Sequence, residues 1–167
     1  KQHIEDGDVF QVVLSQQFEF HVEASPLEVY RVLRSVNPSP YMYLLECEDV
    51  QGDPYHVVGS SPEALVTLQR DKVYSHPIAG SRPRGSNVEE DQAFADALVA
   101  DTKEQAEHLM LVDLARNDLS KVCQPGTVDV TEFMQVERFS HIMHLVSSVE
   151  GDLSPEKSAV DVFRATF

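Results

Sequence analysis

The spacing of hydrophobic residues changes near Glu89, and this change limits the fold classes open to the chain. Before Glu89, short stretches alternate hydrophobic and polar residues, which is typical of strands with one buried face. From Glu89 to about Leu119, hydrophobic residues recur every three to four positions, which is the spacing of helices. Strand patterns return at Val128. Strands and helices grouped in this way predict an α+β domain with helices packed on mostly antiparallel sheet.

Seven segments have strand patterns, separated by turns that contain glycine, proline or charged residues. The turn Gln51-Gly52-Asp53-Pro54 separates two of them, and Arg70-Asp71 separates two more, which we expect to pair antiparallel. The first segment is long enough for one strand or two joined strands. The predicted strands are 9–22, 41–46, 55–58, 64–68, 72–76, 128–130 and 138–149.

Capping residues mark where the predicted helices begin. Ser25-Pro26-Leu27-Glu28 has the form of a capping box with proline in the first helical position, and this helix must end before Pro38. Asp101 predicts a second cap, with Glu104 at the third helical position, where it is expected to share in capping. Ser154 is expected to cap the last helix. The predicted helices are 25–37, 89–100, 101–119 and one that follows 154.

Composition and charge exclude several classes of protein. The 167 residues are 42% hydrophobic and 25% charged, which suits one ordinary globular domain. With 28 acidic and 13 basic residues, the formal net charge is −15, and such a chain repels nucleic acid and anionic membranes unless its basic residues cluster. We therefore expect no nucleic-acid partner and no membrane partner.

The cysteines and the hydrophobic runs indicate a cellular compartment. Cys47 and Cys123 lie far apart without metal-ligand or redox spacing, so we interpret them as free thiols in a reducing environment. No apolar run approaches the ~20 residues that cross a bilayer, and the first residues lack the apolar segment of a secretory signal. These features predict a cytoplasmic protein.

Glu104 and Glu107 are a candidate metal-binding pair. They are three residues apart on a predicted helix, so both carboxylates project from nearly the same face. Such a pair can share a hard divalent cation such as Mg²⁺. The alternative is a solvated surface pair, with Glu104 engaged in capping and His108 either at the surface or behind the acids.

His144 is a candidate acid/base residue. It lies two residues from Ile142 and two from Val146 in a predicted strand, so it shares their face, which we expect to be buried. Histidine is the side chain that most readily gains and loses a proton near neutral pH. A hydrogen-bonded core histidine is the alternative interpretation.

Two further segments could bind a substrate. Gly80-Ser81 follows a strand and precedes a basic loop, so its backbone N–H groups and hydroxyl could hold a carboxylate; an ordinary turn at a strand end is the alternative. Glu63 follows Ser60-Ser61-Pro62, which suggests a short turn that holds the carboxylate at the mouth of a strand. An acidic residue in a first helical turn would have the same pattern.

Taken together, these segments resemble the chorismate-utilising enzymes, and within that family the large subunit (component I) of anthranilate synthase. The similarity runs through nearly all 167 positions. Several motifs in a fixed order are more specific than any one of them. The motifs are GDVFQVVLS (7–15), NPSPYM (37–42), GSSPE (59–63), PIAG (77–80), KEQAEH (103–108), DLARND (113–118) and SHIMH (140–144).

The resemblance implies an enzyme of tryptophan biosynthesis that aminates chorismate and releases pyruvate, giving anthranilate. It also implies a glutamine amidotransferase subunit that supplies ammonia, and Mg²⁺ that anchors a carboxylate of the substrate. By the same resemblance Glu104 and Glu107 are metal ligands, and His144 is the acid/base residue for the elimination. Ala79 and Gly80-Ser81 contact the substrate, and serine keeps the hydroxyl of the threonine usual in the family.

Other matched positions bear on the branch of the family. Glu63 matches a general acid near the chorismate hydroxyl. Gln11 stands where the water-using members have a lysine base, which favours an amine-using branch. Ala79 stands where aminodeoxychorismate synthases often have lysine, so anthranilate is the favoured product and 4-amino-4-deoxychorismate the alternative. The segment Pro40-Tyr41-Met42 matches part of the tryptophan feedback site of regulated members.

The resemblance also sets expectations for the extent of the chain. Family members are layered α+β proteins with orthogonally packed sheets between helices, and their pattern continues past Phe167 with a second acidic pair and carboxylate-binding basic residues. We therefore expect 1–167 to be the N-terminal portion of a chorismate-binding catalytic domain, truncated at the C-terminus. This portion alone is expected to be inactive, with an apolar edge open to self-association. A binding module that kept the scaffold without the chemistry is the third hypothesis.

Overall fold

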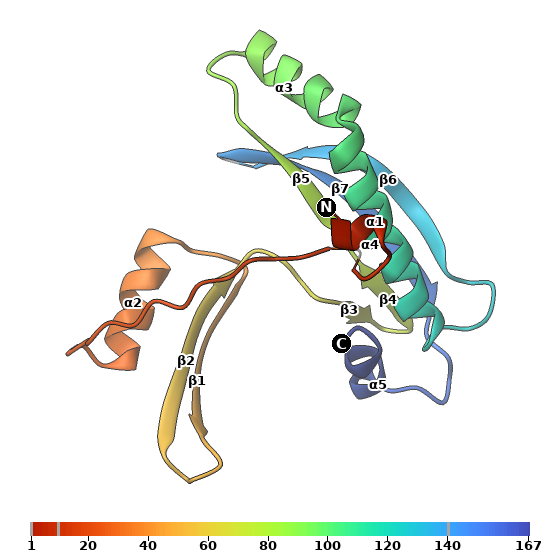
Figure 1. Ribbon diagram of the computed structural model, residues 1–167. Helices are drawn as coiled ribbons and strands as arrows, with labels where there is room; N and C mark the ends of the chain where they lie inside the picture. The colour runs from red at the N-terminus through yellow and green to blue at the C-terminus, as the bar shows by residue number, and fades with distance from the viewer. Residues whose placement is uncertain (1, 10, 140) are drawn as a thin grey trace. The chain divides into compact units, whose positions relative to one another are not determined.

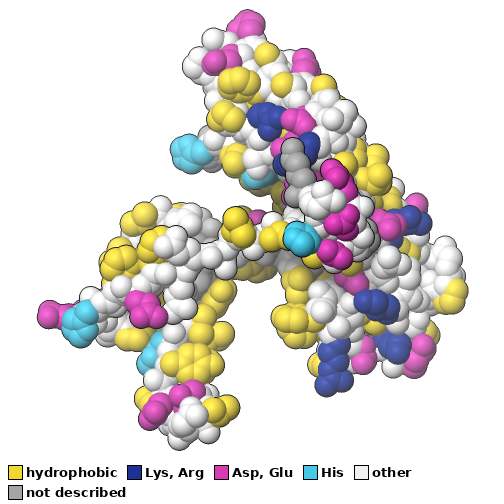
Figure 2. Space-filling model, in the orientation of Figure 1, with side chains coloured by type: hydrophobic (Ala, Val, Ile, Leu, Met, Phe, Trp, Pro, Cys, Tyr) yellow, Lys and Arg dark blue, Asp and Glu magenta, His cyan; other side chains and the backbone are white. Residues whose placement is uncertain are grey.

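The computed structural model describes residues 2–9, 11–139 and 141–167, and the chain divides into two compact units, 1–60 and 61–167. The first unit contains two helices and a two-stranded sheet in which β1 pairs with β2. Hydrophobic side chains of this sheet reach the surface (Figure 2). The elements are α1 (Gln2–Glu5), α2 (Pro26–Val36), β1 (Tyr41–Glu48) and β2 (Pro54–Ser61).

The capping box predicted at Ser25 is confirmed. The hydroxyl of Ser25 accepts a hydrogen bond from the backbone N–H of Glu28, and the carboxylate of Glu28 accepts one from the N–H of Ser25 at 2.8 Å. Pro26 occupies the first turn, where its missing N–H costs nothing. The start of α2 is therefore determined by residues within four positions of one another, which is why the sequence predicts it well.

The strand predicted over 9–22 is wrong for the described residues. Residues 11–23 form neither helix nor strand, and Phe10 lies outside the described residues. The hydrophobic side chains of this segment are exposed, Leu14 at 91% and Phe20 at 81%. An alternating pattern produces a strand only where a neighbouring strand supplies hydrogen bonds, and the described strands of the first unit, β1 and β2, pair with each other.

The second unit is built on a five-stranded antiparallel sheet with β7 at its centre. β7 pairs with β6 on one side and with β4 and β5 on the other, and β3 pairs with β4. Helices α3 and α4 lie along one face of this sheet (Figure 1). The elements are β3 (Thr67–Gln69), β4 (Lys72–Ser75), β5 (Ile78–Pro83), α3 (Val88–Ala100), α4 (Thr102–Ser120), β6 (Asp129–Arg138), β7 (Ile142–Asp152) and α5 (Ala159–Ala165).

These elements confirm the α+β class with antiparallel sheet, and they confirm the pairing predicted across Arg70-Asp71, although β3 is shorter than expected. Cys47 and Cys123 are free thiols, as predicted. Among the helices of the described ranges, none is long and apolar enough to cross a membrane.

The hairpin between β6 and β7 lies where the pattern predicts one continuous strand. The N–H of Phe139 donates to the carbonyl of Ile142 at 2.8 Å and closes the turn, which contains neither glycine nor proline. The prediction also misses β6 between 131 and 137. Two register shifts and the positive φ of Met134 (50°) interrupt the alternation of side chains there, so the pattern of a regular strand is absent.

The last helix begins later than predicted. The capping box of α5 is formed by Ser158 with Asp161, not by Ser154. Ser154 is buried, and its N–H donates to the carbonyl of Val122 at 2.9 Å. Serine followed by proline suits a turn as well as a cap, and here contact with the chain that follows α4 decides in favour of a turn.

The core lies between the helices and the sheet. Met143 and Leu145 of β7 pack with Ala95 and Leu98 of α3, and all four are at most 2% exposed. Because side chains alternate along a strand, His144 points to the opposite face of the sheet. A second cluster of buried residues contains Val73, Val112, Ala115, Leu119, Val122, Cys123, Val149 and Val162.

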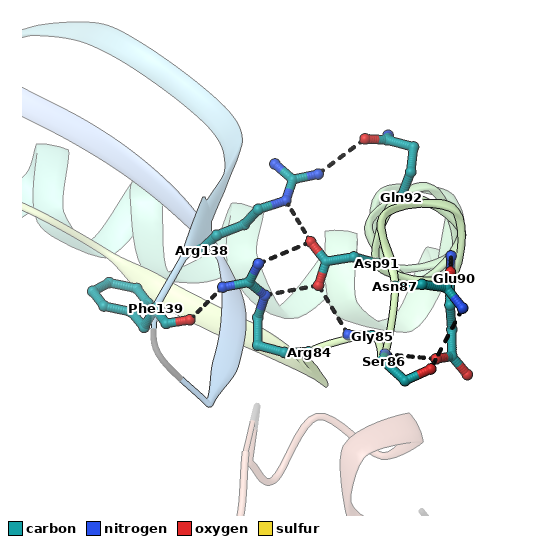
Figure 3. Close-up of polar contacts among 9 residues, drawn as sticks. All are labelled: Arg84, Gly85, Ser86, Asn87, Glu90, Asp91, Gln92, Arg138 and Phe139. Carbon is teal, nitrogen blue, oxygen red and sulfur yellow. Dashed lines mark hydrogen bonds and ion pairs between the residues drawn. The ribbon is translucent and has the colours of Figure 1, made fainter.

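An ion-pair cluster ties the first turn of α3 to the ends of two strands (Figure 3). The carboxylate of Asp91 accepts hydrogen bonds from Nε and Nη2 of Arg84 (2.7 and 3.1 Å), from the N–H of Gly85 (2.9 Å) and from Nε of Arg138 (3.1 Å). Arg84 follows β5, and Arg138 is the last residue of β6. The Arg84 guanidinium and the N–H of Gly85 hold the pKa of Asp91 well below its ordinary value of 3.8.

This cluster predicts a pH-dependent effect of Asp91→Asn. A carboxylate with a lowered pKa in the folded state stabilises the fold above its ordinary pKa, and the stabilisation is lost as pH falls through and below 3.8. We expect the urea midpoint of Asp91→Asn to lie below that of the parent at pH 7, with the difference shrinking below about pH 4. Asp96→Asn, an exposed position of the same helix, is the control. Equal midpoints at pH 7 would contradict the assignment.

Candidate functional site

Gly80 is the point at which Ser81 and His144 meet. β5 has an irregular register between Ala79 and Ser81, and Gly80 between them has a φ of +76°. Nδ1 of His144 lies 3.0 Å from the hydroxyl oxygen of Ser81 and 3.1 Å from the carbonyl oxygen of Gly80. The antiparallel register of β5 and β7, which pairs Ser81 with His144, brings together residues that are 63 positions apart.

These contacts assign the tautomer of His144. A carbonyl oxygen can only accept, so the bond to Gly80 requires the proton on Nδ1. The neutral ring then carries its lone pair on Nε2, the nitrogen that faces away from Gly80. The ring is half-buried, and the ring of Phe139 contacts it edge-on, with centroids 5.7 Å apart and an interplanar angle of 62°. Nε2 of His144 can therefore accept a proton, and it can return that proton as an acid.

The carboxylate of Glu104 approaches Gly80 from α4. A Cβ added to Gly80 would lie 3.1 Å from Oε2 of Glu104, so the absent side chain provides the space in which this carboxylate sits. The prediction that Glu104 shares in capping is wrong. Asp101 accepts from the N–H groups of Lys103 and Glu104, but its own N–H donates to the carbonyl of Leu98, which leaves the Glu104 side chain free of that role.

Glu104 and Glu107 present oxygens to one cation. The ammonium of Lys103 lies 3.6 Å from Oε1 of Glu104 and 3.7 Å from Oε2 of Glu107, so both carboxylates reach the neighbourhood of a single positive charge. Two helix-borne carboxylates suit Mg²⁺, which usually takes one or two protein carboxylates together with water or substrate oxygens. No cluster of three acidic, histidine or cysteine residues that could hold a metal occurs within 2–9, 11–139 and 141–167. The pair therefore fits one side of a metal shell.

Glu63 lies away from this group. It follows β2 in irregular chain, so the alternative of a first helical turn is wrong, and its carboxylate accepts from the hydroxyl of Ser61 at 3.1 Å. It lines a cavity of about 440 Å³ together with His76, Ile78, Leu111 and other residues. None of Ser81, Glu104, Glu107 and His144 lines that cavity.

His108 is a buried contact between α4 and the sheet, so the surface alternative is wrong. The hydroxyl of Ser147 accepts from the N–H of Met134 at 2.9 Å, and it lies 2.7 Å from Nε2 of His108, to which it can donate its proton. Burial lowers the pKa of His108, and the backbone of Ala79 offsets part of this effect. Nδ1 of His108 has no hydrogen bond within the described residues. Sequence analysis could not find this network, because its members come from three elements.

Comparison with known proteins identifies the family. The model of the chorismate binding enzymes matches residues 1–167. The chain belongs to this family. It is 65% identical over 167 residues to anthranilate synthase component 1 of Arthrobacter globiformis, a match that covers 100% of this chain and 32% of that protein. The chain thus spans about a third of the length of this curated relative.

Solved structures agree with this membership of the chorismate binding enzymes. The crystal structure of anthranilate synthase component I from Streptococcus pneumoniae TIGR4 is similar with a TM-score of 0.79 and 45% identity, over 98% of this chain and 34% of that one. A putative 2,3-dihydroxybenzoate-specific isochorismate synthase from Bacillus anthracis is more distant, with a TM-score of 0.65 and 29% identity over 83% of this chain and 36% of that one.

The remaining predicted positions of this chorismate binding enzyme lie in the first unit. Gln11 is in the irregular segment before α2, and the segment Pro40-Tyr41-Met42 leads into β1, with the side chain of Tyr41 partly exposed. Each of the two units is described separately, so the roles of Gln11 and of Pro40-Tyr41-Met42 in a site with residues of the second unit stay predictions.

Gly80→Ala tests the close approach of Glu104. We expect it to lower the free energy of unfolding by more than the ~1–2 kcal/mol that a left-handed φ costs a residue with a Cβ, because the new methyl group also meets Glu104 and Leu98. Gly126→Ala is a matched control, since Gly126 has a φ of +82° and nothing within 4 Å of its Cβ position. Urea unfolding of both variants measures the difference, and equal losses would mean that the contact with Glu104 is unimportant.

Proposed function

We propose that this chain forms part of the chorismate site of an anthranilate synthase component I. The whole protein would convert chorismate and ammonia to anthranilate and pyruvate in tryptophan biosynthesis, with ammonia supplied by a glutamine amidotransferase subunit. The observation that carries the proposal is the meeting of Ser81 and His144 at Gly80, with Glu104 against Gly80 from the side of α4, in a chain 65% identical to an anthranilate synthase component 1.

The residues of this group support distinct roles. The hydroxyl of Ser81 and the backbone N–H groups at Gly80 would hold a carboxylate of chorismate. His144, with its proton on Nδ1, would use Nε2 as acid/base during the elimination of pyruvate. Glu63 lines a separate cavity, so its role as a general acid near the departing hydroxyl rests on the resemblance alone. Gln11 belongs to the other unit, and its role rests on the resemblance alone: a neutral amide cannot serve as a base for water, so ammonia would be the nucleophile.

Glu104 and Glu107 would hold Mg²⁺ in this site. A bound Mg²⁺ would neutralise a substrate carboxylate and orient the ring in a protein whose net charge of −15 otherwise repels a dianion. The ammonium of Lys103 now lies near both carboxylates, and it can move aside because its side chain is 78% exposed.

Anthranilate production from chorismate tests the proposed reaction. The complete protein should form fluorescent anthranilate and an equal amount of pyruvate from chorismate, ammonium and Mg²⁺. Addition of the amidotransferase subunit should allow glutamine to replace ammonium. Chromatography separates anthranilate from 4-amino-4-deoxychorismate, and accumulation of the latter without pyruvate would reject the proposal.

Glu104→Gln and Glu107→Gln test the metal role. Each amide keeps the shape of the side chain but removes a negative charge, so we expect the Mg²⁺ concentration for half-maximal rate to rise at least about tenfold. Asp113→Asn is the control on the same helix, because its side chain is 69% exposed. Unchanged Mg²⁺ dependence in both glutamine variants would show that the carboxylates do not bind the metal.

A further inference from the structure

The turn between β6 and β7 is fixed at Phe139 from two directions. The backbone N–H of Phe139 donates to the carbonyl of Ile142 at 2.8 Å, and its carbonyl accepts from Nη1 of Arg84 at 2.7 Å (Figure 3). Both hydrogen-bonding groups of this residue are therefore engaged, although the residue itself is 41% exposed. A backbone held in this way also fixes the direction of the bond from Cα to Cβ.

The direction of that bond matters because the Phe139 ring touches the imidazole of His144. The centroids are 5.7 Å apart in an edge arrangement. The imidazole is also held at Nδ1, by Gly80 and Ser81. The Cβ–Cγ bond and these contacts at Nδ1 fix one edge of the ring, and the opposite edge can still rock. The Phe139 ring supplies the second restraint that limits this rocking.

Arg84 is suited to hold Phe139 because its guanidinium is a rigid fork. Nε and Nη2 bind the carboxylate of Asp91, and that pairing aims Nη1 at the carbonyl of Phe139. Lysine has a single ammonium and cannot make the paired contact with Asp91 while presenting a third donor in a fixed direction. Arg138 also binds Asp91, but its other described contact is the side chain of Gln92.

We propose that Arg84 is a positioning residue for the acid/base histidine. It connects the carboxylate of Asp91 to the backbone of Phe139, whose ring in turn restrains the imidazole of His144. The link runs from the end of β5 through the β6–β7 turn to β7. This inference rests on the proposed function for the role of His144, while the restraint itself is a property of the folded protein.

The test compares three variants of the complete protein. Arg84→Lys removes the donor to Phe139, and Phe139→Leu removes the ring while leaving the bond from Arg84 to the carbonyl. Arg138→Lys is the matched control, since it makes the same change on the same carboxylate and leaves the hydrogen bond from Arg84 to the Phe139 carbonyl in place. The ring ¹⁵N chemical shifts of His144 are measured without substrate in protein labelled at histidine, with His144→Gln to assign the signals. Steady-state kinetics give kcat and KM with chorismate.

We expect Arg84→Lys and Phe139→Leu to shift the His144 ring signals and to lower kcat by about 10-fold to 100-fold, with little change in KM. Arg138→Lys should leave the signals and kcat near the parent values. If Arg84→Lys does not fold, the ring signals and kcat of Phe139→Leu are compared with those of Arg138→Lys, and this comparison decides whether Phe139 restrains His144. Ring signals and kcat that are the same in all three variants would overturn the positioning role. A parent protein that makes no anthranilate would reject the proposed function, while the ring signals would still test Arg84.

Discussion

Replacing His144 by glutamine in the complete protein is expected to lower kcat for anthranilate formation by about 10²-fold to 10⁴-fold, the usual contribution of a positioned acid/base residue. The amide nitrogen of glutamine overlies Nε2 of histidine, so the contact of Nδ1 with the carbonyl of Gly80 at 3.1 Å has no direct replacement. Glutamine cannot carry a proton to and from a reacting atom at neutral pH. The fold should therefore lose at most about 0.5–1.5 kcal/mol, the usual net contribution of one hydrogen bond, while kcat falls far more.

The histidine in the adjacent turn provides the control for this experiment. His141 is exposed, and it is three residues from His144. His141→Gln should retain kcat within about twofold, as expected for a surface substitution away from the reacting atoms. Stopped assays of anthranilate and pyruvate, together with thermal unfolding of each variant, separate chemistry from folding. A His144→Gln protein as active as the parent would remove His144 from the mechanism.

The second large expected effect is a loss of stability when the core between α4 and the sheet is disrupted. Leu119 is fully buried near the end of α4, within the cluster that contains Val112 and Val149. We expect Leu119→Ala to lower the free energy of unfolding by about 2–5 kcal/mol, because transfer energy is lost and the surrounding side chains close the cavity only in part. Denaturant unfolding of the second unit within the complete protein measures this change.

Leu109→Ala controls for the change in helix propensity. It is the same substitution in the same helix, but Leu109 is 53% exposed. Its effect should stay within about 0.5 kcal/mol, which is usual for a surface position. Similar losses in Leu119→Ala and Leu109→Ala would indicate that the α4 face bearing Leu119 does not form the core of this unit.

Local sequence was a reliable guide to α2, α3 and α4. Each begins at a side chain that accepts a hydrogen bond from a backbone N–H two or three residues later: Ser25, Asn87 and Asp101. The hairpin of β1 and β2 was equally predictable, since its turn contains glycine and proline. Motif resemblance predicted Ser81, Glu104 and His144 individually as site residues. It gave no information on the contacts among these residues.

Errors arose where a local pattern allowed two outcomes. Residues 11–23 alternate like a strand but pair with neither described strand of their unit, and Ser154 resembles a cap but is used in a buried turn. Most of β6 was not predicted, because its bulges interrupt the alternating pattern by which a strand is identified. Pairing with β7 forms the strand despite these bulges. In each case the presence or absence of a partner distant in sequence decided the structure.

The sequence by itself determined the α+β class, the starts of the main helices and the residue types of the candidate site, because caps, turns and motifs act within a few positions. Only the tertiary structure decided that the Glu104 carboxylate lies against Gly80 instead of capping α4, and that Ser81 meets His144 across β5 and β7. It also decided that Arg84 reaches Phe139. These contacts depend on strand register and on how α4 packs on the sheet, which arise from burying the whole core at once.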